Sequence, residues 1–388
     1  MGEIKQLGEA DYHEIFSLSQ FAFQYVLTEE DLVKKKEEAS RHQIWGWMVE
    51  GKLAAKVHII PLASYINGQV FKMGGIASVA TWPEYRRQGM IKNLLFHALQ
   101  EMKKNGQTIS LLSPFSIPFY RKYGWELAFT DKKYDIPIGN LKREWKTQGD
   151  VRRIEKDVAL LHDIYTIYAR KFSGMLTRDE KWWEQRVLTD PSAHIAVAYN
   201  EAGKAEGYLI YKVKERIFTV LEMAYTSLNG WKLLLEFIAN HDSMVKNVKM
   251  IVPENDQLTL LVDDPRFDQK ITPYFMARIV DVLAFLKQYP FQKTGSDWEL
   301  LINVEDSFFP ENSGTYKLTE NAAGVEVDKT SNLQSGIQCT VQQLTVMLLG
   351  YKRPSELYDV GLIHGNIEDI KHLEKLIPEQ QTFLSDFF

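Results

Sequence analysis

The chain has 388 residues, with 46 basic against 51 acidic side chains and a net charge of −5. Hydrophobic residues make up 45% and charged residues 25%, a composition that excludes a largely disordered protein. A chain of this length is expected to form about two to three domains. The small negative charge argues against a nucleic-acid scaffold and against a polybasic membrane anchor, so we expect small-molecule partners.

Cysteine and histidine usage restricts the chemistry further. Cys339 is the only cysteine, so the chain can form neither an intramolecular disulfide nor a cluster of thiolate ligands. The nine histidines show no paired metal-ligand spacing, and no metal is predicted. The N-terminus lacks the features of a signal peptide, and no apolar run reaches the length of about 18 residues that a membrane span needs. We therefore expect a cytoplasmic protein.

A first unit is predicted over residues 1–150. Apolar stripes of helical period, alternating runs and turn residues such as Asn67-Gly68 decide its elements. In chain order the patterns predict helices over residues 10–25 and 29–41, hairpin strands over 44–49 and 53–60, a second hairpin over 62–73, a strand over 76–81, a helix from residue 90, a strand over 108–112 and a short helix over 118–124.

A second unit, residues 151–275, repeats this order of elements and predicts an internal repeat of about 150 residues. Its junction at residues 224–230 has no arginine, so we interpret this copy as a degenerate domain that has lost an anion site. The patterns predict a helix from Val158, a helix capped by Thr177, strands over residues 194–199, 206–213 and 217–223, a helix over 230–240 and a strand over 248–252.

A third unit of mixed α/β type is predicted over residues 276–388. Its patterns predict a helix over residues 276–286, strands over 298–304, 314–318, 324–327 and 337–341, and two helices before an apolar tail.

The segment Gly74 to Ile91 carries the clearest functional signal. An apolar strand leads into a loop with two arginines and Gly89, and a helix follows directly. The free N–H groups of a helix start attract anions, and arginines can add forked hydrogen bonds to phosphate oxygens. The alternative interpretation is an ordinary strand-to-helix turn with solvated arginines.

Two segments resemble the GCN5-related N-acetyltransferase (GNAT) family: Pro83-Glu84-Tyr85-Arg86-Arg87-Gln88-Gly89 before the helix, and Pro118-Phe119-Tyr120-Arg121-Lys122-Tyr123-Gly124-Trp125 after the next strand. Arg86-x-x-Gly89 fits the family's acetyl-CoA loop, while Ile91 replaces the small residue that usually ends it. A bulky residue there resembles the Eis-like (enhanced intracellular survival) subfamily.

This resemblance implies an α/β (α+β) fold with tandem GNAT domains. Residues 1–150 would form a catalytic GNAT domain, residues 151–275 a degenerate one, and residues 276–388 a sterol-carrier-like domain. It also implies acetyl-CoA as co-substrate and a hexamer. The residues implied to bind acetyl-CoA are Val79, Ala80 and Thr81 on a strand that parts from its neighbour, Arg86, Arg87, Gln88, Gly89, Met90 and Ile91 at the helix start, and Ser113 on the neighbouring strand.

Two catalytic residues are implied as well. Tyr120 matches the family's general acid, which protonates the departing thiolate; the alternative is one more core aromatic. The terminal carboxylate of Phe388 is implied as the general base. A tail that reads Phe383-Leu384 and Phe387-Phe388 is too apolar to stay in water, although terminal residues usually fray.

The resulting hypothesis is an N-acetyltransferase that acetylates primary amines by direct attack on acetyl-CoA. Aminoglycoside-like, polyamine-like and lysine-containing acceptors, small molecules or peptides, are all open. One alternative is a carrier of an apolar ligand in the third domain, with a first domain that senses CoA. A structural or regulatory protein is the other.

Overall fold

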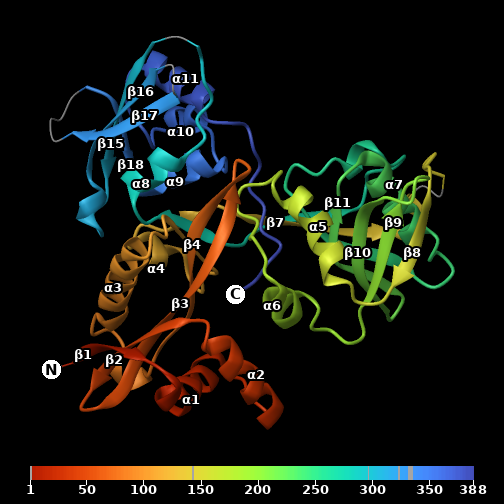
Figure 1. Cartoon of the computed structure of the whole chain (residues 1–388), viewed down its shortest axis with the longest axis horizontal. Coiled ribbons are helices and arrows are strands. Elements are labelled where there is room, and N and C mark those ends of the chain that lie inside the picture. The colour runs from red at the N-terminus through yellow and green to blue at the C-terminus, as the bar shows by residue number, and fades with distance from the viewer. Residues whose placement is uncertain (1, 142–143, 296, 322–323, 331–334) are drawn as a thin grey trace.

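The computed structural model describes residues 2–141, 144–295, 297–321, 324–330 and 335–388. The strands among them form two sheets of seven strands and one of four. In Figure 1 the first domain lies at the lower left, the second at the right and the third at the upper left, and the C-terminus lies between them.

The first domain is built on a mostly antiparallel sheet in the order β1-β2-β3-β4-β5-β14-β6. Asn67 and Gly68 turn the chain between β3 and β4 with φ values of 47° and 75°, which confirms the predicted tight hairpin. The elements are β1 (Glu3–Leu7), α1 (Tyr12–Phe23), α2 (Glu29–Ala39), β2 (Gln43–Val49), β3 (Lys52–Ile66), β4 (Gln69–Thr81), α3 (Met90–Lys104), β5 (Ile109–Leu112), α4 (Ile117–Arg121) and β6 (Glu126–Leu127).

The second domain repeats a sheet of this kind in the order β13-β7-β12-β11-β10-β9-β8. Asp179 caps α6, accepting a hydrogen bond from Trp182 N, so the predicted cap at Thr177 is wrong; the Thr177 hydroxyl instead donates to Ala63 O. The elements are β7 (Thr130–Pro137), β8 (Asp150–Ile154), α5 (Val158–Ala169), α6 (Glu180–Trp182), β9 (His194–Tyr199), β10 (Ala205–Lys214), β11 (Ile217–Tyr225), α7 (Leu228–Ala239), β12 (Asn247–Val252) and β13 (Asp268–Pro273).

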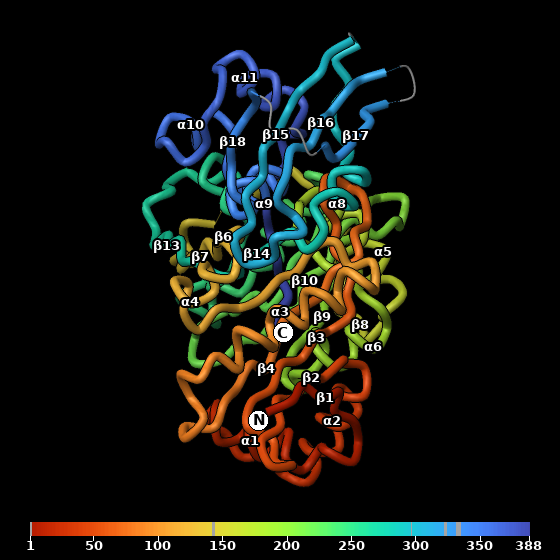
Figure 2. The backbone as a smooth tube through the Cα atoms, turned by 90° about the vertical axis from the view of Figure 1, so that its left-hand side faces the viewer, coloured from red at the N-terminus to blue at the C-terminus, as the bar shows by residue number. Residues whose placement is uncertain are grey.

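The third domain packs helices against a sheet in the order β17-β16-β15-β18. Figure 2, turned by 90°, shows this sheet at the top of the molecule, above the other two domains. The elements are α8 (Val282–Gln288), β15 (Glu299–Glu305), β16 (Gly314–Asn321), β17 (Gly324–Thr330), β18 (Ile337–Thr340), α9 (Val341–Leu349), α10 (Pro354–Asp359) and α11 (Ile367–Leu376).

Sheet membership does not follow the boundaries predicted at residues 150 and 275. Strand β7 lies before the first boundary but pairs with β12 and β13 of the second sheet. The helix predicted over residues 276–286 begins only at Val282. Residues Met276–Ile279 are instead strand β14, which pairs with β5 and β6 of the first sheet. The chain therefore passes from the first sheet to the second between β6 and β7, and it returns to the first sheet between β13 and β14. These two crossings tie the domains together.

A gap opens in the first sheet where β4 and β5 stop pairing. The parallel ladder runs from Met73 and Ile109 to Ile76 and Leu112 and ends there. Just beyond it, β4 has a bulge against β3, and Ser78 takes a left-handed φ of 52°. A bulge bends its strand locally, so the second half of β4 turns away from β5 and leaves its edge open.

The apolar tail is buried, as its sequence predicts. Phe383 is 5% exposed, Leu384 1% and Phe388 8%, whereas Phe387 is 61% exposed. The tail passes between the first two domains, and both views show the C-terminus beside β3 and β4. The last residue of the chain thus ends at the gap in the first sheet.

Candidate active site

A pocket of about 450 Å³ lies at the gap between β4 and β5. It brings together residues that are far apart in the sequence. Its lining comprises Phe16, Ser19, Phe23, Tyr25, Lys35, Glu38, Ala39, His42, His58, Ile60, Ile76, Ala77, Ser78, Val79, Ser113, Pro114, Phe115, Tyr120, Arg186, Phe387 and Phe388. Four of the predicted site residues, Val79, Ser113, Tyr120 and Phe388, are therefore in one place.

The start of α3 has the properties of an anion site. Gly89 is the N-cap residue with a φ of 78°, and Arg87 before it also has a left-handed φ, of 64°. Asn93 N donates to Gly89 O, so the N–H groups that precede it have no partner within the helix. No acidic residue lies in the first turn, and a Cβ added at Gly89 would meet open space. The backbone at Gly89 is therefore open to a ligand that approaches the helix start.

The other residues predicted to bind acetyl-CoA differ in how far their side chains are exposed. Arg86, Arg87 and Gln88 are exposed at the surface of the loop. Ala80 and Met90 are buried, with Ala80 packed towards α1 and Met90 in the core between α3 and the sheet. Of these two residues, only the main chain can serve a ligand. Thr81 and Ile91 are half-buried.

Tyr120 lies on α4 and lines the pocket with only 3% of its surface exposed. Its ring meets Phe115 and Phe119 edge-on, at centroid distances of 5.6 and 5.1 Å. Burial raises the pKa of the Tyr120 phenol above its ordinary value, because a phenolate is poorly stabilised there. The hydroxyl therefore keeps its proton throughout the neutral and mildly alkaline range.

The ring of Phe388 packs over Gly75 of β4. A Cβ added at Gly75 would come within 2.7 Å of this ring, so the close approach requires glycine. Phe275 and Trp182 flank the ring at centroid distances of 5.0 and 6.3 Å. The terminal residue is thus fixed in the wall of the same pocket that Tyr120 lines.

A buried network holds the chain two residues before its end. The Asp386 carboxylate accepts hydrogen bonds from Arg178 Nε at 3.1 Å and from Trp182 Nε1 at 2.7 Å. Arg178 also forms a forked pair with Glu222, at 2.8 and 2.5 Å, and Tyr274 donates to the Asp386 carbonyl oxygen at 2.8 Å. Desolvation raises the pKa of Asp386, and Arg178 opposes that shift. We call these five residues the tail clamp.

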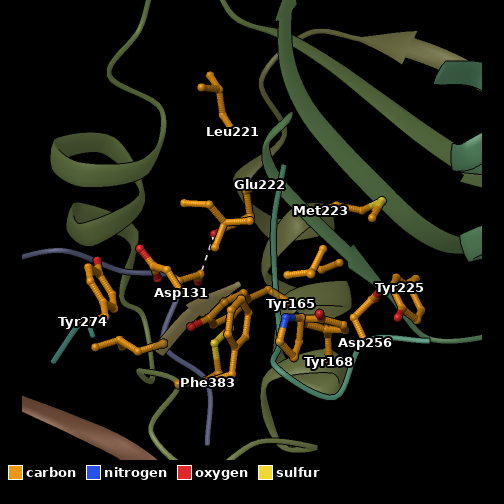
Figure 3. Close-up of a pocket in the computed structure, with 17 residues that line it drawn as sticks. Asp131, Tyr165, Tyr168, Leu221, Glu222, Met223, Tyr225, Asp256, Tyr274 and Phe383 are labelled. Carbon is orange, nitrogen blue, oxygen red and sulfur yellow. Dashed lines mark hydrogen bonds between the residues drawn. The ribbon is translucent and has the colours of Figure 1, made fainter. Parts of the chain in front are cut away.

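The second domain has a smaller cavity, of about 60 Å³, where its own parallel strands part. Strands β11 and β12 pair only from Ile217 and Asn247 to Thr219 and Lys249. Figure 3 shows the cavity, with Tyr165 and Tyr168 of α5 beside Phe383 of the tail. The tail thus fills much of the gap that corresponds to the pocket of the first domain.

The start of α7 lacks an open anion site. The Ser227 hydroxyl accepts a hydrogen bond from Gly230 N, and it donates to the Glu206 carboxylate at 2.7 Å. Asn229 Nδ2 donates to the same carboxylate at 3.2 Å. A side chain satisfies one helix N–H, and a negative charge lies where a phosphate would bind. This agrees with the interpretation of the second copy as degenerate.

Sequence analysis missed a buried basic cluster at the pocket wall. Lys56 of β3 is fully buried, and its Nζ donates to the carbonyl oxygen and the hydroxyl of Ser78 at 3.0 and 2.5 Å. It lies 3.1 Å from His58 Nε2, and His58 Nδ1 lies 3.3 Å from His42 Nδ1. The cluster joins the bulge of β4 to His42, which lies between α2 and β2 and lines the pocket.

Burial sets the protonation of this cluster. Desolvation lowers the pKa of Lys56 to about 7 and that of His42 to about 3, and it lowers the pKa of His58 well below its usual value. Lys56 and His58, the two polar residues within the apolar run Leu53 to Ile60, were the available signal, because charged residues are rarely buried without a purpose.

No three His, Cys, Asp or Glu side chains in the part of the chain that the structure describes are grouped so that they could hold a metal ion. Within the same residues, no helix combines the length and apolar character needed to cross a membrane.

Comparison with known families and proteins adds to this geometry. Residues 3–128 and residues 174–279 match two models of an acetyltransferase (GNAT) domain, and residues 282–385 match the sterol carrier protein domain. An uncharacterized N-acetyltransferase of Streptomyces griseus is 24% identical over 76% of each chain.

Solved structures agree over the whole length. A conserved protein of unknown function from Enterococcus faecalis V583 is 29% identical and superimposes with a TM-score of 0.93, with all of both chains covered. Eis1 of Mycobacterium abscessus shares the fold at 19% identity, with a TM-score of 0.83 over all of both chains. This chain is an acetyltransferase that belongs to the GNAT family, with two GNAT domains followed by a sterol-carrier-like domain.

Proposed function

We propose that the first domain transfers the acetyl group of acetyl-CoA to a primary amine, in the manner of an Eis-like enzyme. The observation that carries this proposal is the convergence of Tyr120 and the chain terminus, Phe388, on one pocket. That pocket opens where β4 parts from β5, and β4 leads directly into the loop before α3.

Acetyl-CoA supplies a thioester-activated acetyl group, and the residues present fit such a molecule. Its pyrophosphate would meet the N–H groups between Arg87 and Ile91, with Arg86 alongside. Its pantetheine arm would lie along the free edge of β4 from Val79 to Thr81, and Ser113 lies on the opposite side of the gap.

The pocket supplies one group for each proton. As the amine nitrogen bonds to the thioester carbon, the Phe388 carboxylate accepts the proton that this nitrogen loses. The carbon–sulfur bond breaks, and the Tyr120 hydroxyl donates its proton to the departing sulfur. The products are an amide and a free thiol. The proton held by the carboxyl group then returns to the tyrosine oxygen through solvent, which restores both groups.

We also propose a class of acceptor and an oligomeric state. A primary amine on an aminoglycoside-like, polyamine-like or lysine-containing molecule would fit direct attack. A hexamer is proposed from the resemblance to the Eis-like subfamily alone.

Thiol release from acetyl-CoA, measured with and without a panel of amines, tests this function. We expect release that depends on an amine. A chain extended by a few glycines beyond Phe388 removes the carboxylate from the pocket and should lose about tenfold to a hundredfold in kcat. The control chain carries the same added glycines at the N-terminal end, before Gly2, and keeps Phe388 as its last residue. Full turnover in the C-terminally extended chain would contradict the role of the terminus.

A further inference from the structure

The bulge of β4 lies directly before the strand edge at which the pantetheine arm of acetyl-CoA is proposed to bind. Strands β3 and β4 run side by side (Figure 1), and at the bulge two residues of β4, Ser78 and Val79, oppose the single residue Val57 of β3. Ser78 has a left-handed φ of 52°, a conformation that costs free energy in a residue other than glycine. Neighbouring groups must therefore hold Ser78 in place.

Lys56 of β3 supplies the contacts that hold Ser78. Its Nζ donates to the Ser78 carbonyl oxygen at 3.0 Å and to the Ser78 hydroxyl at 2.5 Å. Its other partner among the described residues is His58 Nε2, at 3.1 Å. An ammonium group has three N–H donors, so these three acceptors use all of them when Lys56 carries its proton. One side chain thus fixes both the backbone and the hydroxyl of Ser78.

The peptide group after Ser78 connects this contact to the open edge of β4. The bond between Ser78 and Val79 is trans, and the N–H of a planar trans peptide points away from its carbonyl oxygen. The hydrogen bond from Lys56 to the Ser78 carbonyl oxygen therefore also sets the direction of the Val79 N–H. Val79 lines the pocket and lies beyond the last pair of β4 with β5, Ile76 and Leu112.

The buried position of Lys56 costs the fold free energy. The side chain is fully buried, and its partners among the described residues carry no negative charge. Desolvation accordingly lowers the pKa of the amine to about 7. An apolar side chain at such a position is often neutral or stabilising, and residues that break the rules of packing are expected at functional sites. The position thus favours a role in the site over a role in folding.

From the bulge and its buried contacts together, we propose that Lys56 is a positioning residue for acetyl-CoA, which holds the Ser78–Val79 peptide so that the edge of β4 can meet the pantetheine arm. This rests on the proposed function and adds to it a residue that touches no substrate. Lys56 is fully buried and does not line the pocket, so it acts through the backbone of β4.

Binding of two ligands to the full-length protein tests this role. Acetyl-CoA would use both the start of α3 and the edge of β4, whereas 3′-phospho-ADP, which is CoA without its pantetheine arm, would use the helix start alone. Lys56→Met should raise Kd for acetyl-CoA about fivefold to tenfold, because the arm loses ordered partners, and should leave Kd for 3′-phospho-ADP unchanged. Calorimetric titration measures both. KM for acetyl-CoA should rise by a similar factor, with kcat nearly unchanged.

Matched variants assign the effect to the hydrogen bonds of Lys56. Glutamine and methionine are similar in length, but only glutamine keeps an N–H donor, so Lys56→Gln should bind acetyl-CoA more tightly than Lys56→Met. Ser78→Ala should weaken acetyl-CoA binding in the wild type and have no further effect in Lys56→Met, because the two residues act together. The control is Lys72→Met, at an exposed position of β4 outside the pocket, and it should bind both ligands as the wild type does.

The outcomes separate this inference from the proposed function. If the wild type does not bind acetyl-CoA, the proposed function itself fails. If the wild type binds acetyl-CoA and Lys56→Met binds it equally well, the function stands and the role of Lys56 is wrong. An equal loss for both ligands, or an equal loss in Lys56→Met and Lys56→Gln, would also overturn the inference, because the effect would then not come from the bonds that Lys56 donates to Ser78.

Discussion

The two GNAT domains begin their central helices in opposite ways. At α3 the cap is Gly89, the preceding loop carries Arg86 and Arg87, and no acidic residue lies in the first turn. At α7 the cap is Ser227, whose hydroxyl bonds a helix N–H and the Glu206 carboxylate. The backbone arrangement is similar, but the side chains decide whether an anion can bind. A repeated fold therefore need not repeat the site.

The gap between the parallel strands is also open in the first domain and largely filled in the second. In the first domain the gap is a pocket of about 450 Å³, and in the second domain the tail leaves a cavity of about 60 Å³. The tail lines the gap of the second domain, and the tail clamp holds the chain just before it reaches the pocket of the first domain.

The largest effect should come from Tyr120→Phe, because chemistry is assigned to the first domain alone. Losing the proton donor should lower kcat by about a hundredfold or more while KM for acetyl-CoA changes little. The variant keeps the ring and its packing against Phe115 and Phe119. Steady-state thiol release measures the effect, and the matched control is Tyr123→Phe on the same turn. Activity like that of the wild type would remove Tyr120 from the reaction.

The tail clamp predicts the next effect, in a residue that touches no substrate. Asp386→Asn keeps the shape of the side chain but weakens its pairing with Arg178, so the Phe388 carboxylate should lose its fixed position. We expect kcat to fall about tenfold, KM for acetyl-CoA to stay the same, and added formate to restore part of the activity. Positioning, unlike simple stability, would give this rescue.

Glu374→Gln is the control for Asp386→Asn. It removes a carboxylate that pairs with Arg353 in the third domain at 2.7 Å, and neither residue lines the pocket. Its kcat should remain that of the wild type, with no response to formate. If Asp386→Asn and Glu374→Gln both lose kcat and formate restores neither, the tail clamp only stabilises the fold.

The sequence predicted what depends on neighbouring residues and missed what depends on distant ones. The Asn67-Gly68 hairpin and the helix after Gly89 follow from local preferences and are present. The apolar pattern around strand β14 predicts part of a helix, whereas the strand is fixed by pairing with β5, between residues more than 150 positions apart. Burial of the tail followed from its composition, but its partner Arg178 lies 208 positions from Asp386 and had no local signal.

The anion site at α3 should give a smaller effect than the catalytic changes. Arg86→Gln and Arg87→Gln should each raise KM for acetyl-CoA about threefold to tenfold and leave kcat nearly unchanged, because the helix N–H groups remain. Calorimetric titration should find one acetyl-CoA per chain. The control Glu206→Gln, which removes the carboxylate at α7, should still bind only one, since Ser227 continues to cap that helix. If the wild type binds two molecules of acetyl-CoA per chain, the start of α7 also binds the ligand, and the two helices do not differ in this respect.

The last difference between the two GNAT domains concerns their buried cations, and it affects stability. In the second domain the buried Arg178 is paired with Glu222 and Asp386. In the first domain the partners of the buried Lys56 Nζ among the described residues are uncharged: Ser78 and His58. Burial lowers the pKa of Lys56 to about 7, below its value in the unfolded chain. A buried amine without a charged partner therefore loses its proton at a lower pH in the folded chain than in the unfolded chain.

This difference gives the free energy of unfolding a defined pH dependence. Between about pH 7 and about pH 10 the unfolded chain holds a proton on Lys56 that the folded chain lacks, so stability rises with pH there, by up to about 1.4 kcal/mol per unit. Lys56→Met removes this contribution. Urea unfolding at several pH values should therefore show a steeper rise for the wild type than for Lys56→Met. Parallel curves for the two proteins would mean that Lys56 is charged in the folded state, and the two domains would then not differ in how they hold a buried cation.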